Sequence, residues 1–320
     1  MIYISRNDIE TLGTNWHETT DVIVECIRTC DAGQFAQPLK PYLRYGDRKN
    51  RIIAMPAYLG GRFHIAGVKW IASFPDNVNI GKPRASSVVI LNDGATGEVA
   101  AIVSGSNLSA IRTASVSGAI VKSYIGERKR DRYRIGIIGL GPIGRAHVSM
   151  CRAVMGCRAD FVVFDRKRDS MEQFEKREDV TLADSWEEAY IGSDIVITCT
   201  VSESRYIALA PRPGALLLNV SLRDYTTDIF KDVAETIFVD DWDEVCRENT
   251  DVEQFHNLCG LKKDKARTLA DIVLRKALHD CPLHAPIMVN PMGMAVFDVA
   301  IATYYVSLAN EKAAGKRLEA

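Results

Sequence analysis

Three glycines near the middle of the chain have the spacing of a dinucleotide-binding turn. An apolar run at 134–138 precedes them, and a segment with a helical pattern follows. In such a strand, turn and helix, the first glycine permits the turn, the second admits a pyrophosphate, and the third lets the helix pack on the strand. The N-terminus of the helix can then hold the phosphates. The residues expected to contact the cofactor here are Gly139, Gly141, Pro142, Ile143 and Gly144.

An acidic residue after the next apolar run favours NAD. Asp165 follows the run 161–164. It comes somewhat more than the roughly 20 residues after the first glycine that are typical of the acid that binds the ribose 2′-hydroxyl. Arg166, Lys167 and Arg168 come next and could accept the 2′-phosphate of NADP, so NADP stays an alternative. A glycine turn in an unrelated α/β sheet is the other interpretation of this stretch.

Two cations occupy positions where a charge is unusual. Lys69 lies within the apolar run 67–71, where the alternative is a lysine at a strand end whose ammonium reaches solvent. Arg112 lies near the start of a predicted helix at 109–124, where a positive charge is unfavourable unless an anion binds beside it. That anion could be a substrate carboxylate or a cofactor phosphate, and we expect Arg112 to contact both.

Polar side chains follow two of the strands predicted after the glycine turn. Ligands of open parallel sheets bind beyond the carboxyl ends of the strands. Thr200, Ser221 and Asp224 are expected at such ends, and Asp228, a few residues further on, is an alternative to Asp224 as an acid or base.

The segments that carry these residues differ in pattern along the chain. In the first part, the runs 51–59 and 62–71 predict one β-hairpin, and 87–91 and 98–103 predict a second. This part is therefore expected to be antiparallel and rich in strands. Helices are expected at 21–32, 109–124, 170–178, 186–189, over most of 242–283, and at 294–311.

Beyond a charged linker at 126–132, strands rich in Val, Ile and Leu alternate with helical segments. That alternation is typical of a doubly wound parallel sheet. We therefore expect an α/β protein with a Rossmann domain at 126–293. A second, α+β domain is expected from 1–125 plus 294–320, because the last helix can return to the first part of the chain.

Composition narrows the class of partner. The chain has 320 residues, 47% of them hydrophobic, and a net charge of −1, which leaves no basic surface for nucleic acid and favours a small-molecule partner. The start has no basic region before an apolar core, so we expect a soluble cytoplasmic protein that contacts no membrane. Eight scattered cysteines without a C-x-x-C pair are expected to be reduced thiols. No metal site is expected, because the cluster of His279, Cys281 and His284 lacks a second pair at zinc spacing.

Several blocks of the sequence resemble the ornithine cyclodeaminase and mu-crystallin family over nearly the full chain. General family features are Lys69 after a hairpin turn, the turn at 91–93, the block 109–117 and the spaced glycines. Four further blocks resemble the branch of that family that makes 2,3-diaminopropionate for siderophores and peptide antibiotics. These blocks are 37–44, 51–56, 239–242 and 290–295. The region 254–277 departs from this branch and is shorter.

The resemblance implies an NAD-dependent oxidative cleavage of N-(2-amino-2-carboxyethyl)-L-glutamate. A hydride passes from the glutamate α-carbon of the secondary amine to NAD, and water adds to the resulting imine, releasing 2-oxoglutarate and 2,3-diaminopropionate. The first part of the chain and the last helix would bind substrate and pair two subunits through the β-sheet, giving a homodimer. Alternatives are an ornithine cyclodeaminase, another amino acid dehydrogenase or ketimine reductase, and a non-catalytic nucleotide-binding protein like mu-crystallin.

The resemblance also assigns roles to residues. The three carboxylates of this substrate need cations, and the family positions for that task are Arg44, Lys69 and Arg112, although a surface loop is the alternative for Arg44. Asp224 would take the nitrogen proton and later help water attack, so Lys69 and Asp224 are the expected catalytic residues. Asp298 also occupies a family position, but an acid on a helix face is more often solvated. Arg112, Asp165, Thr200 and Ser221 complete the expected cofactor site, and Arg84 is a weaker candidate for substrate binding.

Overall fold

The computed structural model describes residues 1–47 and 49–319, which form two compact units. Unit 1 comprises Met1–Arg112 and Met294–Ala320, and unit 2 comprises Thr113–Gly293. The last helix therefore returns to the first part of the chain, as its position predicted.

The chain passes from unit 1 to unit 2 inside one long helix. We expected the boundary at residue 125, close to the end of this helix, α3 (Gly105–Glu127), but the division lies nearer its start. The later turns of α3 pack within unit 2, where Ser117 Oγ lies 2.8 Å from His147 Nε2. No proline interrupts the sequence of this helix. The boundary between the units therefore has no signal in the local sequence.

Unit 1 combines a mostly antiparallel sheet with helices. Its strands are β1 (Ile2–Ile4), β2 (Phe35–Ala36), β3 (Tyr42–Leu43), β4 (Arg51–Leu59), β5 (Ile65–Ser73), β6 (Ala85–Asp93), β7 (Val99–Ser104) and β16 (Lys316–Arg317), and its other elements are α1 (Arg6–Leu12), α2 (Trp16–Asp31), η1 (Pro75–Ile80) and α11 (Ala295–Glu311). The strands follow the order β16-β1-β7-β6-β5-β4-β2, with β3 paired to β4. Both predicted hairpins are confirmed, since β4 pairs with β5 and β6 with β7, all antiparallel.

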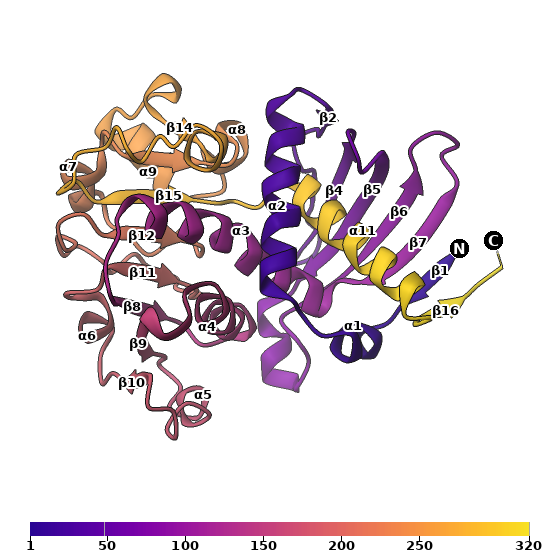
Figure 1. The fold of residues 1–320 in the computed structure, drawn as a ribbon. Helices are drawn as coiled ribbons and strands as arrows, with labels where there is room; N and C mark the ends of the chain where they lie inside the picture. The colour runs from indigo at the N-terminus through magenta and orange to yellow at the C-terminus, as the bar shows by residue number, and fades with distance from the viewer. Residues whose placement is uncertain (48, 320) are drawn as a thin grey trace. The chain divides into compact units, whose positions relative to one another are not determined.

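One face of the unit 1 sheet is covered by helices. Figure 1 shows α2 and α11 lying over the same face. Side chains alternate between the two faces along a strand. Lys69 lies opposite Met55 and Val89 in the row that faces α11, since its Nζ donates to Asp298 of that helix. The next side chain, Trp70, therefore points to the other face and is 43% exposed.

Unit 2 is built on a parallel sheet. Its strands are β8 (Tyr133–Ile138), β9 (Ala159–Phe164), β10 (Val180–Leu182), β11 (Ile195–Thr198), β12 (Leu216–Asn219), β13 (Ile237–Val239), β14 (Arg267–Thr268) and β15 (Ile287–Asn290). Its helices after α3 are α4 (Pro142–Met155), η2 (Gly156–Arg158), α5 (Asp169–Glu172), α6 (Trp186–Tyr190), η3 (Thr227–Ile229), α7 (Phe230–Val233), α8 (Trp242–Val245), α9 (Asp251–Cys259), η4 (Lys263–Lys265) and α10 (Leu269–Val273). The strand order is β10-β9-β8-β11-β12-β15-β13-β14, and the paired strands run parallel. The predicted doubly wound parallel sheet is therefore confirmed.

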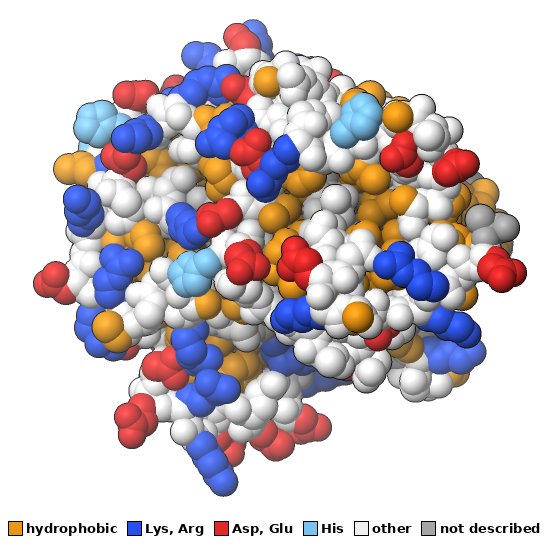
Figure 2. Space-filling view, turned by 45° about the vertical axis from the view of Figure 1, so that its right-hand side comes forward, with side chains coloured by type: hydrophobic (Ala, Val, Ile, Leu, Met, Phe, Trp, Pro, Cys, Tyr) orange, Lys and Arg blue, Asp and Glu red, His pale blue; other side chains and the backbone are white. Residues whose placement is uncertain are grey.

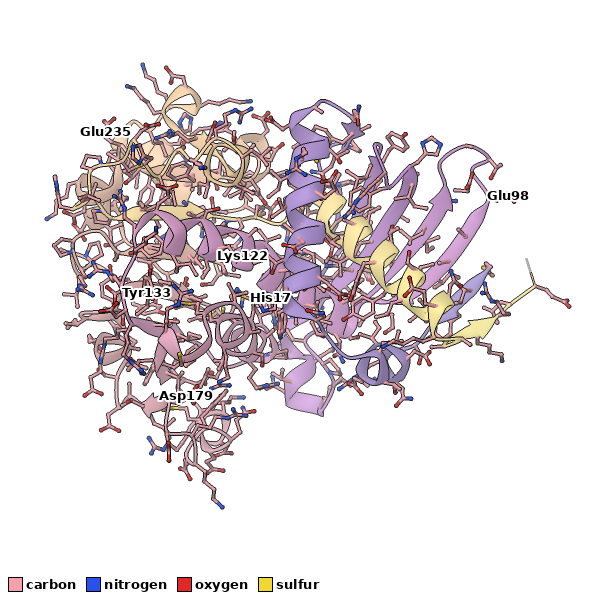
Figure 3. The ribbon with its side chains drawn as sticks, viewed as in Figure 1. His17, Glu98, Lys122, Tyr133, Asp179 and Glu235 are labelled. Atoms are coloured by element: carbon pink, nitrogen blue, oxygen red, sulfur yellow. The ribbon has the colours of Figure 1, made fainter. Side chains whose placement is uncertain are left out.

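The sheet of unit 2 begins where the charged linker ends. Tyr133, labelled in Figure 3, is the first residue of β8. Its hydroxyl donates to the carbonyl of Arg128 at 2.8 Å. Arg128 in turn donates to the carbonyl of Cys281 at 2.6 Å. These bonds fix the linker to the start of the central strand, so part of the expected linker is packed rather than solvated.

Two expected helical regions differ from the prediction. The helix expected at 170–178 is reduced to α5, because the residues after it are mostly charged and only Phe174 there is deeply buried. The region 242–283 contains the short helices α8, α9 and α10 together with strand β14. A strand of two residues is too short for a pattern of alternation to predict it.

No helix in the described residues combines the length and the apolar character needed to span a membrane. Lys and Arg side chains lie interspersed with Asp and Glu on the face drawn in Figure 2. This mixture agrees with the net charge of −1 and shows no single-sign field on that face.

Candidate active site

The three glycines of the turn after β8 each meet a different steric demand. Gly139 has a φ of +95°, and a Cβ there would lie 2.6 Å from the carbonyl oxygen of Cys199. A Cβ on Gly144 would lie 1.9 Å from the carbonyl oxygen of Gly139, whereas one on Gly141 would meet nothing within 4 Å. The first glycine thus makes the turn, the third permits close packing, and the second leaves its face open to a ligand, as the spacing predicted.

The turn lies at the switch point of the sheet. The strand β8 pairs with β9 on one side and with β11 on the other. The order of the strands therefore reverses at β8, which is where open parallel sheets bind their ligands. Helix α4 begins at Pro142, and its N-cap residue Gly141 has no side chain to cap the free N–H groups of the first turn. A pyrophosphate would satisfy these N–H groups, so the residues present fit a dinucleotide.

Asp165 is fixed beside this turn by backbone donors. Its Oδ2 accepts a hydrogen bond from the N–H of Leu140 at 2.7 Å, and its Oδ1 accepts one from the N–H of Lys167 at 2.8 Å. A cavity of about 360 Å³ adjoins it. The cavity is lined by Phe164, Asp165, Arg166, Arg168, Met171, Ala183 and Asp184. The carboxylate is therefore held beside the glycine turn, with two arginines lining the same cavity.

Three of the predicted residues of unit 2 meet around one carboxylate. Asp224 is fully buried, and it accepts hydrogen bonds from the hydroxyls of Thr200 and Ser221. The alternative carboxylate, Asp228, lies in η3 and accepts a hydrogen bond from the hydroxyl of Thr226 at 2.9 Å. The structure thus places Asp224, and not Asp228, with the polar residues at the ends of β11 and β12.

A second buried carboxylate, which the sequence analysis missed, supports the Asp224 loop. Asp251 is the first residue of α9, and its Oδ2 accepts hydrogen bonds from the backbone N–H groups of Asp224 and Tyr225, both at 3.1 Å, and from Asn219 Nδ2 at 3.0 Å. Its Oδ1 accepts a hydrogen bond from Arg205 Nε at 2.6 Å. Burial raises the pKa of Asp251, although these hydrogen bonds and the charge of Arg205 oppose the rise.

The position of Asp251 in the sequence hides this role. It follows the N-cap residue Thr250, and an acid in the first turn of a helix is common on solvated surfaces. The loop that it supports also contains Leu222 with a φ of +65°, a strained conformation for a residue other than glycine. The N–H of Asp251 donates to the carbonyl of Leu222 at 2.8 Å. Both the backbone and the side chain of Asp251 therefore hold the loop.

The two cations of unit 1 meet on one carboxylate. Lys69 Nζ and Arg112 Nε lie 2.9 Å and 3.1 Å from Oδ1 of Asp298. Lys69 is 2% exposed and Asp298 is fully buried. The prediction that Asp298 is solvated was therefore wrong, because nearly every side of α11 is buried around it, and a lysine reaching solvent is excluded for Lys69.

Burial and charge act against each other in this cluster. Burial lowers the pKa of Lys69 to about 8, the charge of Asp298 opposes that shift, and the charges of Arg112 and Lys40 add to it. Burial alone would raise the pKa of Asp298, but the two neighbouring cations outweigh it and lower that pKa. The buried Lys40, close enough to affect Lys69, is a cation that the sequence analysis did not single out.

Arg44 lies in a different environment from these buried cations. It is exposed, and its guanidinium carbon lies 5.3 Å from the centre of the Tyr42 ring. Arg51 lies over the same ring at 5.7 Å. The structure therefore brings Lys69 and Arg112 together and places Arg44 on an aromatic platform near the chain's β3 strand.

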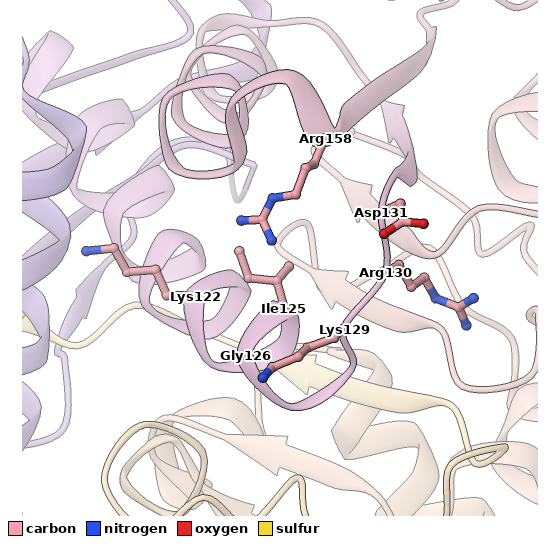
Figure 4. Close-up of a pocket in the computed structure, with 7 residues that line it drawn as sticks. All are labelled: Lys122, Ile125, Gly126, Lys129, Arg130, Asp131 and Arg158. Carbon is pink, nitrogen blue, oxygen red and sulfur yellow. The ribbon is translucent and has the colours of Figure 1, made fainter.

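A cavity of about 630 Å³ in unit 2 contains none of the predicted site residues (Figure 4). It lies at the end of α3 and is lined by Lys122, Ile125, Gly126, Lys129, Arg130, Asp131 and Arg158. Arg130 is paired with Asp194 at 3.2 Å, so part of its positive charge is already neutralised.

Comparisons with known proteins identify the family. The model of the ornithine cyclodeaminase/mu-crystallin family matches residues 3–313. The chain belongs to this family. Within the family, N-((2S)-2-amino-2-carboxyethyl)-L-glutamate dehydrogenase of Staphylococcus aureus is 31% identical over 345 residues, which cover 99% of this chain and 98% of that protein. The resemblance predicted from the sequence blocks is confirmed.

Solved structures of the family share the fold. One such structure is Δ1-pyrroline-2-carboxylate reductase of Thermococcus litoralis in complex with NADH and L-proline. It superposes with a TM-score of 0.88 at 22% identity, and the match covers 99% of this chain and 100% of that one. An archaeal alanine dehydrogenase dimer with bound NAD superposes with a TM-score of 0.83 at 22% identity, covering 100% of this chain and 99% of that one. At these identities the two structures support the fold of both units.

Proposed function

We propose that the protein is an NAD-dependent amino acid oxidoreductase that cleaves N-(2-amino-2-carboxyethyl)-L-glutamate to 2-oxoglutarate and 2,3-diaminopropionate. The observation that carries the proposal is the buried cluster of Lys69, Arg112 and Asp298 in a chain that also has a complete dinucleotide turn. The similarity to the staphylococcal dehydrogenase along nearly the whole chain supports this substrate over others of the family.

The cofactor would be held by the turn after β8. The open face at Gly141 and the first N–H groups of α4 suit the pyrophosphate, and Asp165 suits the ribose hydroxyls. Thr200, Ser221 and Arg112 are the further residues that we assign to this site. When bound there, NAD would supply the hydride acceptor for oxidation at the glutamate α-carbon of the substrate.

Charged residues of unit 1 would bind the substrate. Lys69 and Arg112 present an ammonium and a guanidinium with several N–H donors, which suit carboxylates. Arg44 is assigned to a further carboxylate of the substrate. These contacts orient the carbon that loses the hydride, and this orientation is the basis for counting Lys69 as catalytic.

Asp224 would carry the protons of the reaction. As the hydride leaves the carbon, the secondary amine loses its N–H proton to this carboxylate, which yields the imine. Water then adds to the imine carbon, and the proton returns to the leaving amine as the C–N bond breaks. The products are 2-oxoglutarate, 2,3-diaminopropionate, NADH and one proton, so atoms and charges balance. The diamino acid would serve as a precursor of a siderophore or peptide antibiotic.

The reaction is tested with the purified protein, NAD and this substrate. We expect NADH to accumulate together with 2-oxoglutarate in equal amounts. An ornithine cyclodeaminase would instead release ammonia from ornithine without net NADH, and a simple amino acid dehydrogenase would form NADH with alanine. A protein that binds NAD and turns over none of these substrates would be a nucleotide-binding protein like mu-crystallin.

We also propose that two copies pair through the uncovered face of the unit 1 sheet. Ala54, Trp70 and Val88 are cross-strand neighbours on that face, and Pro56, Val68, Ile90 and Ile102 form the next row. A row of apolar side chains with Trp70 at 43% exposure is typical of an interface. Sedimentation should show a dimer, and Trp70→Asp should shift it toward the monomer. We further propose a cytoplasmic location, which the free cysteines support.

A further inference from the structure

The Asp298 carboxylate joins three elements that are far apart in the sequence. It belongs to the first turn of α11, whereas Lys69 comes from β5 and Arg112 from α3. Its Oδ1 accepts hydrogen bonds from both cations, at 2.9 Å and 3.1 Å. Its Oδ2 is buried and accepts no hydrogen bond from any described residue. One oxygen therefore makes both of the side chain's contacts.

We propose that Asp298 is the positioning residue of the substrate-carboxylate site. Its Oδ1 holds the Lys69 ammonium and the Arg112 guanidinium side by side, so that the two cations together receive one carboxylate of the amino acid substrate. The inference rests on the proposed function, since it concerns how that same site binds its substrate.

Charge is the physical reason for this arrangement. Two buried cations that contact the same oxygen repel each other, and burial further disfavours the charged form of each. The groups that face Lys69 are Asp298 of α11, Arg112 of α3 and Lys40 of the segment before β3, and only Asp298 among these three is negative. Without the charge of Asp298, Lys69 would lose its proton more readily, and a neutral amine attracts a carboxylate weakly.

The unbonded Oδ2 of Asp298 allows a substitution that changes charge and keeps shape. In Asp298→Asn, the amide oxygen can take the position of Oδ1 and keep both hydrogen bonds. The amide nitrogen then takes the position of Oδ2, where no described donor is in contact with it. The variant removes the negative charge while keeping the shape and the two contacts. Asp298→Ala removes charge and contacts together and serves as the comparison.

The test is the pH dependence of KM for the proposed substrate. At about pH 6, Lys69 is protonated in both proteins, so KM should change by less than about threefold in Asp298→Asn. At about pH 9, KM should rise about tenfold relative to the wild type, because each unit by which the pKa of Lys69 falls lowers its protonated fraction about tenfold. A KM raised by the same factor at both pH values would show that Asp298 only supports the fold and would overturn the proposal.

A matched background shows whether the effect passes through Lys69. Arginine stays charged in this pH range. In the Lys69→Arg background, the added Asp298→Asn substitution should therefore change KM by the same factor at both pH values. An effect of Asp298→Asn that still grew with pH in this background would contradict the proposal. Far-UV circular dichroism should be unchanged in all these variants and reports that they are folded.

A readout without turnover separates this inference from the proposed function. In protein labelled with 13C at the lysine ε-carbons, the Lys69 signal, identified by its loss in Lys69→Arg, should titrate about one unit lower in Asp298→Asn than in the wild type. An unchanged titration would overturn the inference. If the wild type forms no NADH from the proposed substrate while the Lys69 titration still moves, the proposed function fails and the role of Asp298 as the positioning residue stands.

Discussion

The buried carboxylates of the two units are stabilised in opposite ways. In unit 1, Asp298 is balanced by two formal cations on a single oxygen. In unit 2, Asp224 accepts hydrogen bonds from two neutral hydroxyls, and Asp251 accepts from three N–H groups in addition to Arg205. The stability of an ion-paired carboxylate depends on the protonation of its partners, and therefore on pH. The stability of a carboxylate held by neutral donors depends on the geometry of its hydrogen bonds. The difference predicts which substitutions and which conditions affect each unit.

The largest effect is expected at Asp224, which accepts hydrogen bonds from two hydroxyls. Asp224→Asn should lower kcat about 10²- to 10⁴-fold, because the amide cannot take the proton of the substrate amine. Its affinity for NAD should stay within about twofold of the wild type, since the glycine turn is untouched. Steady-state kinetics and NAD titration measure the two quantities. Asp228→Asn is the matched control and should retain turnover; loss of turnover in that variant alone would reverse the assignment of the acid/base.

The next effect contrasts Asp251 with Asp298 directly. Both oxygens of Asp251 accept hydrogen bonds, so an amide nitrogen in Asp251→Asn must oppose a donor on one side or the other. We expect the free energy of unfolding to fall by about 3 kcal/mol, because a buried ion pair and its hydrogen bonds are broken. Asp298→Asn can keep both of its hydrogen bonds, so its cost in the same urea titration reports the lost charge alone.

An exposed ion pair provides the control for this stability comparison. Asp243 and Lys263 lie 2.9 Å apart with side chains 59% and 63% exposed, so Asp243→Asn should leave the midpoint of unfolding unchanged. If Asp251→Asn were equally silent, the loop that carries Asp224 would be held by its own backbone rather than by α9.

The pH dependence of stability should separate the two units. Burial lowers the pKa of His147 in unit 2 to about 4, against the hydrogen bond with the carbonyl of Ile143. The unfolded chain, with a histidine pKa near 6.5, therefore binds a proton that the folded chain does not between about pH 6.5 and 4. Stability should fall by about 2 kcal/mol as the pH falls through this window, and His147→Gln should flatten that slope.

The alkaline window belongs to unit 1. Burial lowers the pKa of Lys69 to about 8, so between about pH 8 and 10.5 the unfolded chain holds a proton that the folded chain has lost. Stability should therefore rise with pH in this window, and Lys69→Met should remove the rise without changing the acid slope. Chemical unfolding at a series of pH values measures both. An acid slope that also vanished in Lys69→Met would show that the two sites are coupled.

The same contrast explains what the sequence could predict. The glycine turn, Asp165 and the strands of unit 2 follow from local spacing and apolar runs, because those signals arise from neighbouring residues. The burial of Asp298 does not follow, because α11 is apolar on nearly all sides and only its packing in unit 1 shows that the acid is enclosed. Asp251 was missed for a similar reason, since its partners Asn219 and Arg205 are brought to it by the fold.

The smallest effect is expected at a fourth carboxylate, Asp165. Asp165 accepts hydrogen bonds from the backbone N–H groups of Leu140 and Lys167, and it lines a cavity together with Arg166 and Arg168. Asp165→Ser removes the negative charge near a 2′-phosphate while keeping a hydroxyl acceptor, so KM for NAD should rise about tenfold and the use of NADP should become measurable. Asp184→Ser is the control, because Asp184 lines the same cavity but lies 3.7 Å from Arg168 at the surface. If both variants shifted the cofactor preference equally, the net charge of the cavity, and not the position of Asp165 beside the turn, would select NAD.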